Sequence, residues 1–282
     1  MRTLNKYRMR LVATALTIGS LVGLDACKQN EAVFERSSAS ARVGGPDFMF
    51  YALADGNQLL QLNTANPQTV MATTTITGLQ TGDRIIGVDF RPATGQLYGV
   101  SGSSRLYVIN PLTGTARMIG AGPFSTMIMS DGVAVDFNPT VDRLRLVTNS
   151  GQNFRLNPET GTIMAMDGNI NGAPGAIVTS AAYTNNRSGV TSTVLYDIDP
   201  ITDRLYIQNP PNNGTLVSVG PLGVDIAGSS GFDISSDGTS ALASLNVAGR
   251  TELHQINLAT GRAEKVGDLP NGILGVAIPT EA

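Results

Sequence analysis

Short apolar segments recur along most of the chain, and polar turns rich in Asn, Pro, Thr and Gly separate them. The turn 110–115, Asn-Pro-Leu-Thr-Gly-Thr, is typical. An Asn side chain accepts backbone hydrogen bonds, Pro presets φ, and Gly takes the positive φ that ends a hairpin loop. Related turns begin at Asn63, Asn157, Asn209 and Asn257, in steps of 47, 47, 52 and 48 residues. Such even spacing predicts a propeller or another repeat array.

Aligning the units at these turns predicts four short strands in each. The clearest unit has strands at 85–90, 96–100, 105–109 and 115–119. The next three have them at 133–137, 143–147, 153–156 and 162–166; at 178–183, 194–198, 204–207 and 215–219; and at 231–234, 241–245, 252–256 and 262–266.

The two ends of the repeat region complement each other. The first unit has strands at 48–53, 59–62 and 70–75 but lacks an opening strand, and the apolar segment 273–278 resembles that missing strand. The alternative is that 273–278 is only an apolar tail. We predict an all-β fold, a five-bladed β-propeller of four-stranded antiparallel blades whose ring is closed by the C-terminal strand, because closure removes the open sheet edges.

The N-terminus differs from the repeats. Four basic side chains precede the uncharged run 11–24, as in a secretory signal peptide. The following Leu24-Asp25-Ala26-Cys27 is similar to a bacterial lipobox, although Asp25 stands where a small or uncharged residue is usual. We therefore expect residues 1–27 to be a lipoprotein-type signal peptide with lipidation at Cys27, which would place the protein in the bacterial cell envelope. The alternative is plain secretion.

Residues 28–46 are small and polar and end in Gly and Pro, which predicts a flexible tether to a single propeller domain at 47–282. Without residues 1–27 the chain keeps 15 Lys and Arg against 21 Asp and Glu, a net charge near -6. This charge argues against binding to nucleic acid or to an anionic membrane surface. We expect membrane contact only through the lipid anchor, and a monomer. Cys27 is the only cysteine, so no disulfide framework is predicted.

Three segments resemble the bacterial family known as domain of unknown function 4394. They are Ile-Gly-Val-Asp-Phe-Arg-Pro at 86–92, the stretch 134–145, and Asn-Pro-Pro-Asn-Asn-Gly-Thr-Leu at 209–216. The resemblance covers about residues 47–279. It implies a secreted or surface-attached propeller-like domain, without an established activity or catalytic residues to transfer.

Ligands of propellers are expected on the face formed by the blade-to-blade loops, because a rigid scaffold positions loop residues for binding. The loop 120–132 is the longest and least polar of these. Its apolar side chains could form an adaptable contact patch. The alternative is that they fold inward over the channel. The ligand-binding candidates on the loops are Asp83, Arg84, Phe124, Met127, Met129, Asp131 and Asp225.

Asp89, Asp136 and Asp233 recur at one position of the innermost strand and are the channel-lining candidates. Carboxylates there could perform acid-base chemistry or hold Ca²⁺. A repeated Asp is more often structural, accepting backbone N–H bonds from the neighbouring blade. We expect no cofactor, with Ca²⁺ as the alternative. The chain has no Trp, which weakens the idea of a glycosidase with a sugar-stacking platform.

Other catalytic patterns are absent from the sequence. His254 is the only histidine and falls in a third strand, toward the outside of its blade, so we expect it to be a surface or packing residue. Neither a His-Cys zinc cluster nor a Ser-His triad is expected. Residues 197–203 resemble a calcium loop but lack its Gly and closing Glu, so a polar hairpin turn is expected. The sequence favours a binding module for a protein, peptide or glycan. The alternative is a carboxylate- or calcium-dependent hydrolase of the lactonase or glycosidase type.

Overall fold

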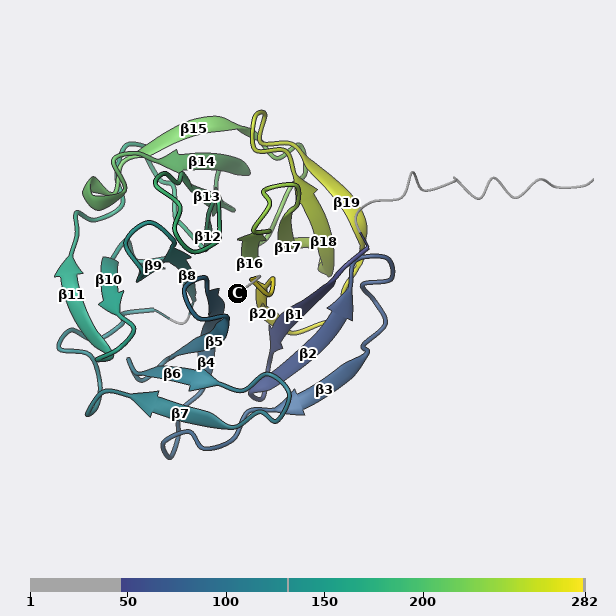
Figure 1. The fold of residues 1–282 in the computed structure, drawn as a ribbon. Coiled ribbons are helices and arrows are strands. Elements are labelled where there is room, and N and C mark those ends of the chain that lie inside the picture. Colours follow the sequence, from purple (N-terminus) through teal and green to yellow (C-terminus); the bar gives the residue numbers. More distant parts are fainter. Residues whose placement is uncertain (1–46, 131, 281–282) are drawn as a thin grey trace, which may run out of the picture. The chain divides into compact units, whose positions relative to one another are not determined.

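Five four-stranded antiparallel sheets surround a common axis in the computed structural model, which describes residues 47–130 and 132–280 (Figure 1). Blade 1 contains β20 (Ile273–Ala277), β1 (Met49–Ala54), β2 (Gln58–Asn63) and β3 (Ala72–Thr75). Blade 2 contains β4 (Ile85–Arg91), β5 (Gln96–Ser101), β6 (Leu106–Ile109) and β7 (Ala116–Ile119). Blade 3 contains β8 (Val133–Asn138), β9 (Arg143–Thr148), β10 (Asn153–Asn157) and β11 (Thr162–Met166).

Blade 4 contains β12 (Ser180–Tyr183), β13 (Leu195–Asp199), β14 (Arg204–Gln208) and β15 (Leu216–Pro221), with the 3-10 turn η1 (Pro211–Asn213) before β15. Blade 5 contains β16 (Ser229–Ile234), β17 (Ala241–Val247), β18 (Arg250–Ile256) and β19 (Ala263–Asp268). The predicted five-bladed propeller is confirmed, and most strand boundaries agree within one or two residues. The expected signal peptide with Cys27 and the expected tether, residues 1–46, lie outside the described residues.

The ring closes where the sequence predicted. β20 pairs antiparallel with β1, with Tyr51 opposite Ala277 and Leu53 opposite Gly275. Ile273 and Val276 of β20 are buried. The inner edge of blade 1 is therefore covered by the last strand of the chain, which removes an exposed sheet edge.

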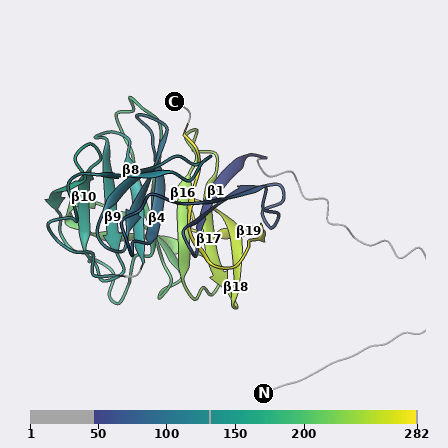
Figure 2. The same ribbon diagram turned by 90° about the horizontal axis from the view of Figure 1, so that it is seen from below.

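Apolar side chains pack between successive blades. Between blades 2 and 3, for example, the rings of Tyr98 and Phe137 meet edge to face, with centroids 5.2 Å apart. Both rings belong to a buried cluster that also contains Ile86 and Leu146. The core is thus a series of inter-blade layers around the axis. Figure 2 shows the ribbon of the ring from its edge.

The repeated Asn turns form a second set of contacts near the rim. Asn110 Oδ1 accepts hydrogen bonds from the backbone N–H groups of Leu112 and Thr113, at 2.9 and 3.1 Å. Gly114 has a φ of +73°, and a Cβ there would lie 2.0 Å from the carbonyl oxygen of Thr75 in blade 1. The turn of one blade therefore packs directly on the outer strand of the preceding blade.

The same close approach recurs around the circumference. A Cβ on Gly161 would lie 2.1 Å from Ile119 O, and one on Gly261 would lie 2.5 Å from Gly220 O. Between blades 5 and 1, a Cβ on Gly267 would lie 2.7 Å from Pro67 Cγ. We call these glycine contacts the outer belt. They explain why the repeat is so regular, since only glycine fits at these positions.

Blade 4 departs from the repeat. Its first two strands are joined by the eleven residues 184–194, whereas blades 2 and 3 use the four residues 92–95 and 139–142. This connection contributes to the longer 52-residue step in the sequence. In the part of the chain that is described, no helix is long and apolar enough to cross a membrane.

Candidate functional site

The three repeated aspartates bind backbone N–H groups at the centre of the ring. Asp89 Oδ2 accepts a hydrogen bond from Phe137 N in the next blade, at 2.7 Å. Asp136 Oδ1 accepts one from Tyr183 N, at 3.0 Å, and Asp233 Oδ2 accepts one from Ile278 N, at 2.6 Å. Each carboxylate thus joins its own blade to the following one. This agrees with the structural role expected for a repeated Asp, which is to accept backbone N–H bonds from a neighbouring blade.

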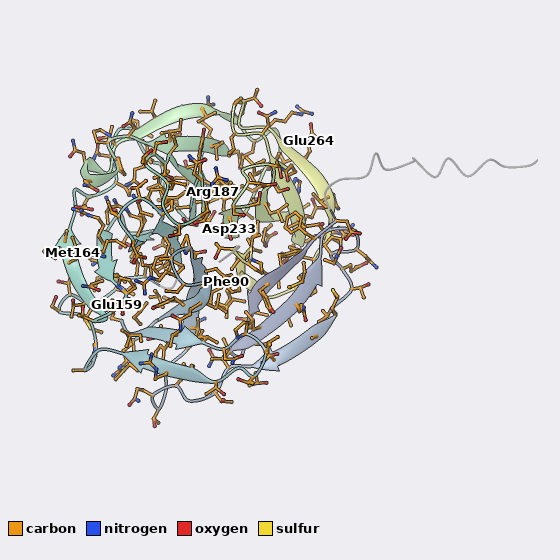
Figure 3. The ribbon with its side chains drawn as sticks, viewed as in Figure 1. Phe90, Glu159, Met164, Arg187, Asp233 and Glu264 are labelled. Carbon is orange, nitrogen blue, oxygen red and sulfur yellow. The ribbon has the colours of Figure 1, made fainter. Side chains whose placement is uncertain are left out.

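The same carboxylates serve two more N–H groups, because two blades lack the aspartate. Ala182 of blade 4 and Ala277 of blade 1 occupy its position. The N–H groups of Ile234 and Phe90 therefore have no aspartate in the preceding blade to bind. Each is instead bound by the aspartate next to it in sequence: Ile234 N donates to Asp233 Oδ1 at 2.6 Å, and Phe90 N donates to Asp89 Oδ1 at 2.7 Å. Five of the six carboxylate oxygens therefore accept a backbone N–H. We call this arrangement the central carboxylate ring; Figure 3 shows Asp233 and Phe90 near the axis.

The carboxylates also repel one another. One oxygen from each of the three lies within 4.8 Å of the others, and all three side chains are buried. Burial raises the pKa of Asp136 well above its ordinary value, and the charges of Asp89 and Asp233 raise it further. Burial also raises the pKa of Asp89 well above its ordinary value and that of Asp233 to about 7.

Asp136 Oδ2 is the oxygen of the ring that has no hydrogen-bond partner among the described residues. A proton on this oxygen would relieve the repulsion without breaking any of the five N–H bonds. The geometry therefore fits a partly protonated structural cluster. Carboxylate oxygens are also suitable ligands for Ca²⁺, but five of these six oxygens already accept hydrogen bonds from backbone N–H groups.

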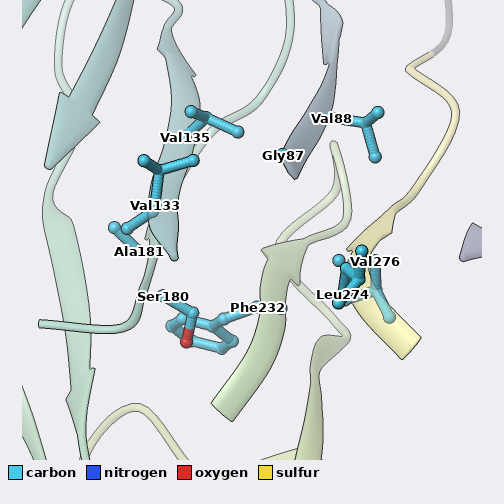
Figure 4. A pocket seen from close by; sticks show the side chains of 12 residues that line it. Gly87, Val88, Val133, Val135, Ser180, Ala181, Phe232, Leu274 and Val276 are labelled. Carbon is cyan, nitrogen blue, oxygen red and sulfur yellow. The ribbon is translucent and has the colours of Figure 1, made fainter. Parts of the chain in front are cut away.

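The axis beside these aspartates is narrow. The central cavity has a volume of about 20 Å³ and is lined by backbone and small or apolar side chains, including Gly87, Val135, Ala181 and Val276 (Figure 4). A Cβ on Gly231 would lie 2.3 Å from Val276 N, so the inner strands are in close contact. The three aspartates are not among the lining residues, and the cavity has room for about one water molecule.

The loop candidates fall into two groups. Phe124, predicted as a ligand contact, is 4% exposed and packs in the core between blades 2 and 3, so that interpretation is wrong. Asp83 is buried as well: its Oδ1 pairs with Arg105 Nη1 at 3.0 Å, and its Oδ2 accepts a hydrogen bond from the hydroxyl of Tyr107. Phe124 is buried because the apolar side chains of its loop pack inward, and Asp83 is buried because its carboxylate pairs with Arg105 and Tyr107. The exposed candidates are Arg84, Met127, Met129 and Asp225, while Asp131 lies outside the described residues.

A groove opens on the opposite face, between blades 3 and 4. Its volume is about 470 Å³, within the range of small-molecule sites. Its walls are Asn138 and Thr140 from the turn after β8, residues 191–195 from the long blade 4 loop, and Ile207, Gln208, Asn209 and Pro211 around β14 and η1, together with Tyr183. We call it the blade 3–4 groove. A second groove, of about 660 Å³, lies at the Asn110 turn and is lined by that repeated turn and by residues of β5, β6 and β7, including Arg117.

Buried polar groups lie between the same two blades. Arg145 is 1% exposed; it pairs with Asp167 at 2.6 Å, and its Nε donates to the hydroxyl of Tyr183 at 3.2 Å. Asp197 of β13 is fully buried, and neither of its carboxylate oxygens has a hydrogen-bond partner among the described residues. Burial raises the pKa of Asp197 to about 8, although the charge of Arg145 lowers it.

The predicted role of His254 as a surface or packing residue omitted a contact: it is buried and bonded to Glu252 Oε2 at 2.9 Å. Sequence reasoning also missed Arg145, the burial of Asp197 in β13, and the groove. Two signals were available, namely an Arg within the apolar run of β9 and the one repeat step that is longer than the others.

Together these features define a closed β-propeller. Its inner strands leave only a small cavity at the centre, and the two larger grooves described above lie on its surface. The chain belongs to the family described as "Domain of unknown function (DUF4394)", whose model matches residues 58–277.

The comparison with solved structures finds similar chains at low sequence identity. A structural genomics protein of unknown function from Bacteroides thetaiotaomicron is 15% identical, with a TM-score of 0.51 over 84% of this chain and 68% of that one. A putative 6-phosphogluconolactonase from Bacteroides uniformis is 16% identical, with a TM-score of 0.43 over 80% of this chain and 69% of that one. The Dos1 propeller is 13% identical, with a TM-score of 0.41 over 82% and 60%. No curated protein matches the sequence.

Proposed function

We propose that this protein is an exported binding module, held at the cell envelope by a lipid on Cys27, that recognises its ligand without chemical turnover. The observation that supports it is the state of the central carboxylates, since five of their six oxygens accept backbone N–H bonds. A general acid or base must reach a substrate proton, and these groups lie beside a cavity of about 20 Å³. The hydrolase alternative therefore has less support.

The ligand site that we propose is the blade 3–4 groove. The inter-blade loop face was the earlier expectation, but Phe124 and Asp83 of that face are buried and committed to internal contacts. Met127 and Met129 remain exposed there and could still contribute to a protein contact. The groove is a concave surface of about 470 Å³, and it lies where the repeats differ.

The test is a ligand screen on the full chain carrying Cys27→Ser, which prevents acylation. Amide chemical shifts would be followed while pools of neutral, acidic and basic small molecules and short peptides are added, and each pool would be checked for turnover by mass spectrometry. We expect shifts around residues 184–194 with every compound recovered intact. Turnover of a compound, or no shift with any pool, would contradict the proposal.

The anchor has its own test. In a bacterial host, the unaltered chain should fractionate with membranes, and Cys27→Ser should move it to the soluble fraction, since one acylated cysteine supplies the membrane affinity. Equal distribution of both forms would contradict the anchor without bearing on ligand binding.

A further inference from the structure

The blade 3–4 groove has an uncharged lining. None of the residues that form it is Asp, Glu, Lys, Arg or His. Arg145 lies nearby but is buried, with its guanidinium bonded to Asp167, Asn153 and Asn212. The groove therefore provides no charge to balance an anionic or cationic ligand, and an ion placed there would lose hydration without compensation.

The polar groups of the lining both donate and accept hydrogen bonds. Thr191 and Ser192 contribute exposed hydroxyls, and Asn209 contributes an amide. The hydroxyl of Thr140 already donates to Asn138 Oδ1, and that of Thr193 to Thr184 O, both at 2.6 Å. Groups of this kind complement ligand hydroxyls, which also donate and accept. The apolar part of the lining, which includes Val194, Ile207 and Pro211, can cover C–H surfaces between those hydroxyls.

We infer that the groove binds a neutral saccharide. This inference rests on the proposed binding function and specifies its ligand. A volume of about 470 Å³ is at the lower end of small-molecule sites and suits one or two sugar rings.

The long loop that forms one wall is held at its base. Thr184 N donates to Val194 O, and Val194 N donates to Thr184 Oγ1, both at 2.9 Å. Asn185 Nδ2 donates to Ser192 O at 2.9 Å. These bonds fix the backbone and leave the side chains of Thr191 and Ser192 exposed beside the groove, which lowers the entropy cost of binding.

The opposite wall contains an unsatisfied acceptor. Gln208 lines the groove and is 1% exposed; its Nε2 donates to Pro211 O at 2.6 Å, but its Oε1 has no partner among the described residues. The buried amide of Asn186, in the long loop, also has none. Leaving such groups unpaired is unfavourable. Gln208 Oε1 is itself buried, so a ligand hydroxyl would reach it only after the side chains of this wall shift.

Binding should be weak. The aromatic ring of the lining, Tyr183, is 1% exposed, so ring stacking can contribute little. Hydrogen bonds to exposed hydroxyls then provide most of the affinity, which predicts a Kd on the order of 1 mM for a single sugar ring. This mode agrees with the absence of Trp, which excludes the usual indole platform.

The experiment is saturation-transfer NMR on the full chain carrying Cys27→Ser. The probes are glucose, galactose, mannose, N-acetylglucosamine and their disaccharides, compared with glucuronate, glucosamine and the peptide Gly-Ser-Thr-Gly. Ser192→Trp fills the groove from the exposed wall, and Asn209→Ala removes one amide. Thr94→Trp is the matched control, because Thr94 is exposed in the equivalent short turn of blade 2 and does not line the groove.

We expect transfer to at least one neutral sugar, loss of that signal in Ser192→Trp, an increase in Kd of up to about tenfold in Asn209→Ala, and no change in Thr94→Trp. Preference for the charged sugars or the peptide would overturn the saccharide inference while leaving a binding module in place. Sugar binding that survives Ser192→Trp, or no transfer to any sugar while other compounds shift residues 184–194, would also overturn it. Failure of every compound would reject the proposed function itself.

Discussion

Replacing Asp197 by Asn should stabilise the protein increasingly as the pH rises. Asp197 lies opposite Ala181 in the β12–β13 ladder, and the equivalent second-strand positions of other blades are Gly99, Leu146 and Ala243. Its carboxylate oxygens have no hydrogen-bond partners among the described residues. A buried carboxylate without partners is costly to ionise, whereas an amide carries no charge at any pH.

The sign follows from the pKa values. Burial raises the pKa of Asp197 from 3.8 to about 8. Well below pH 3.8 the group is protonated in both the folded and the unfolded chain and contributes no penalty. As the pH rises towards 8, the unfolded chain ionises first, and the folded state loses up to about 1.4 kcal/mol per pH unit. Between pH 5 and pH 8, Asp197→Asn should therefore gain about 4 kcal/mol relative to the unaltered protein.

Urea unfolding at pH 5, 6, 7 and 8 measures this difference. The matched control is Asp199→Asn on the same strand, because Asp199 Oδ1 accepts from Ile177 N and Ile201 N and its Oδ2 accepts from Thr202. That change should destabilise the protein across the range, since an amide nitrogen cannot accept those bonds. A stability difference for Asp197→Asn that does not change with pH would refute the reasoning.

Three further predictions follow from the packing. Deleting residues 272–282 should lower the free energy of unfolding by about 6 kcal/mol or prevent folding, because three buried aliphatic side chains are lost at about 2 kcal/mol each. In urea melts, a loss of only a few tenths of a kcal/mol, as expected for a deletion of 281–282 alone, would contradict closure of the ring by β20. Asp89→Asn should lower the free energy of unfolding by about 1–3 kcal/mol, because both carboxylate oxygens of Asp89 accept N–H bonds. Asp136→Asn should lower it less, because Asp136 accepts one such bond. EDTA should leave the melting temperature unchanged, and a fall with EDTA would favour a calcium site. Phe124→Ala should cost about 3–5 kcal/mol and Met129→Ala less than about 0.5 kcal/mol in the same melts, and equal effects would show that Phe124 is not a core residue.

The fold could be predicted because its signals are local and repeated. Asn110 and Gly114 specify a hairpin turn through their own hydrogen bond and φ, without reference to the rest of the chain. Five related turns then give the blade number, and the unpaired segment 273–278 finds its place because one unit lacks a strand. Alternating apolar residues supply the remainder, since a strand side chain points in or out with a period of two.

The site could not be predicted in the same way, because it depends on contacts between blades. Whether Phe124 faces a ligand or the core is decided by the neighbouring blade 3, which no local pattern encodes. From the sequence, Asp89 could be either a ligand-binding residue or a structural one. Its hydrogen bonds from Phe90 N and Phe137 N identify the structural role. The lining of the groove combines a turn of blade 3 with two segments of blade 4, and these three segments are spread over residues 138–211.

The pairing of Tyr51 with Ala277 also determines when the protein can become stable. β1 cannot receive its inner partner until residues 273–277 have been synthesised, so the ring stays open while the intervening blades are made. Until then the inner edge of β1 can pair with other chains, so early folding carries a risk of aggregation. The order of the strands thus delays completion of the fold until β20 is available.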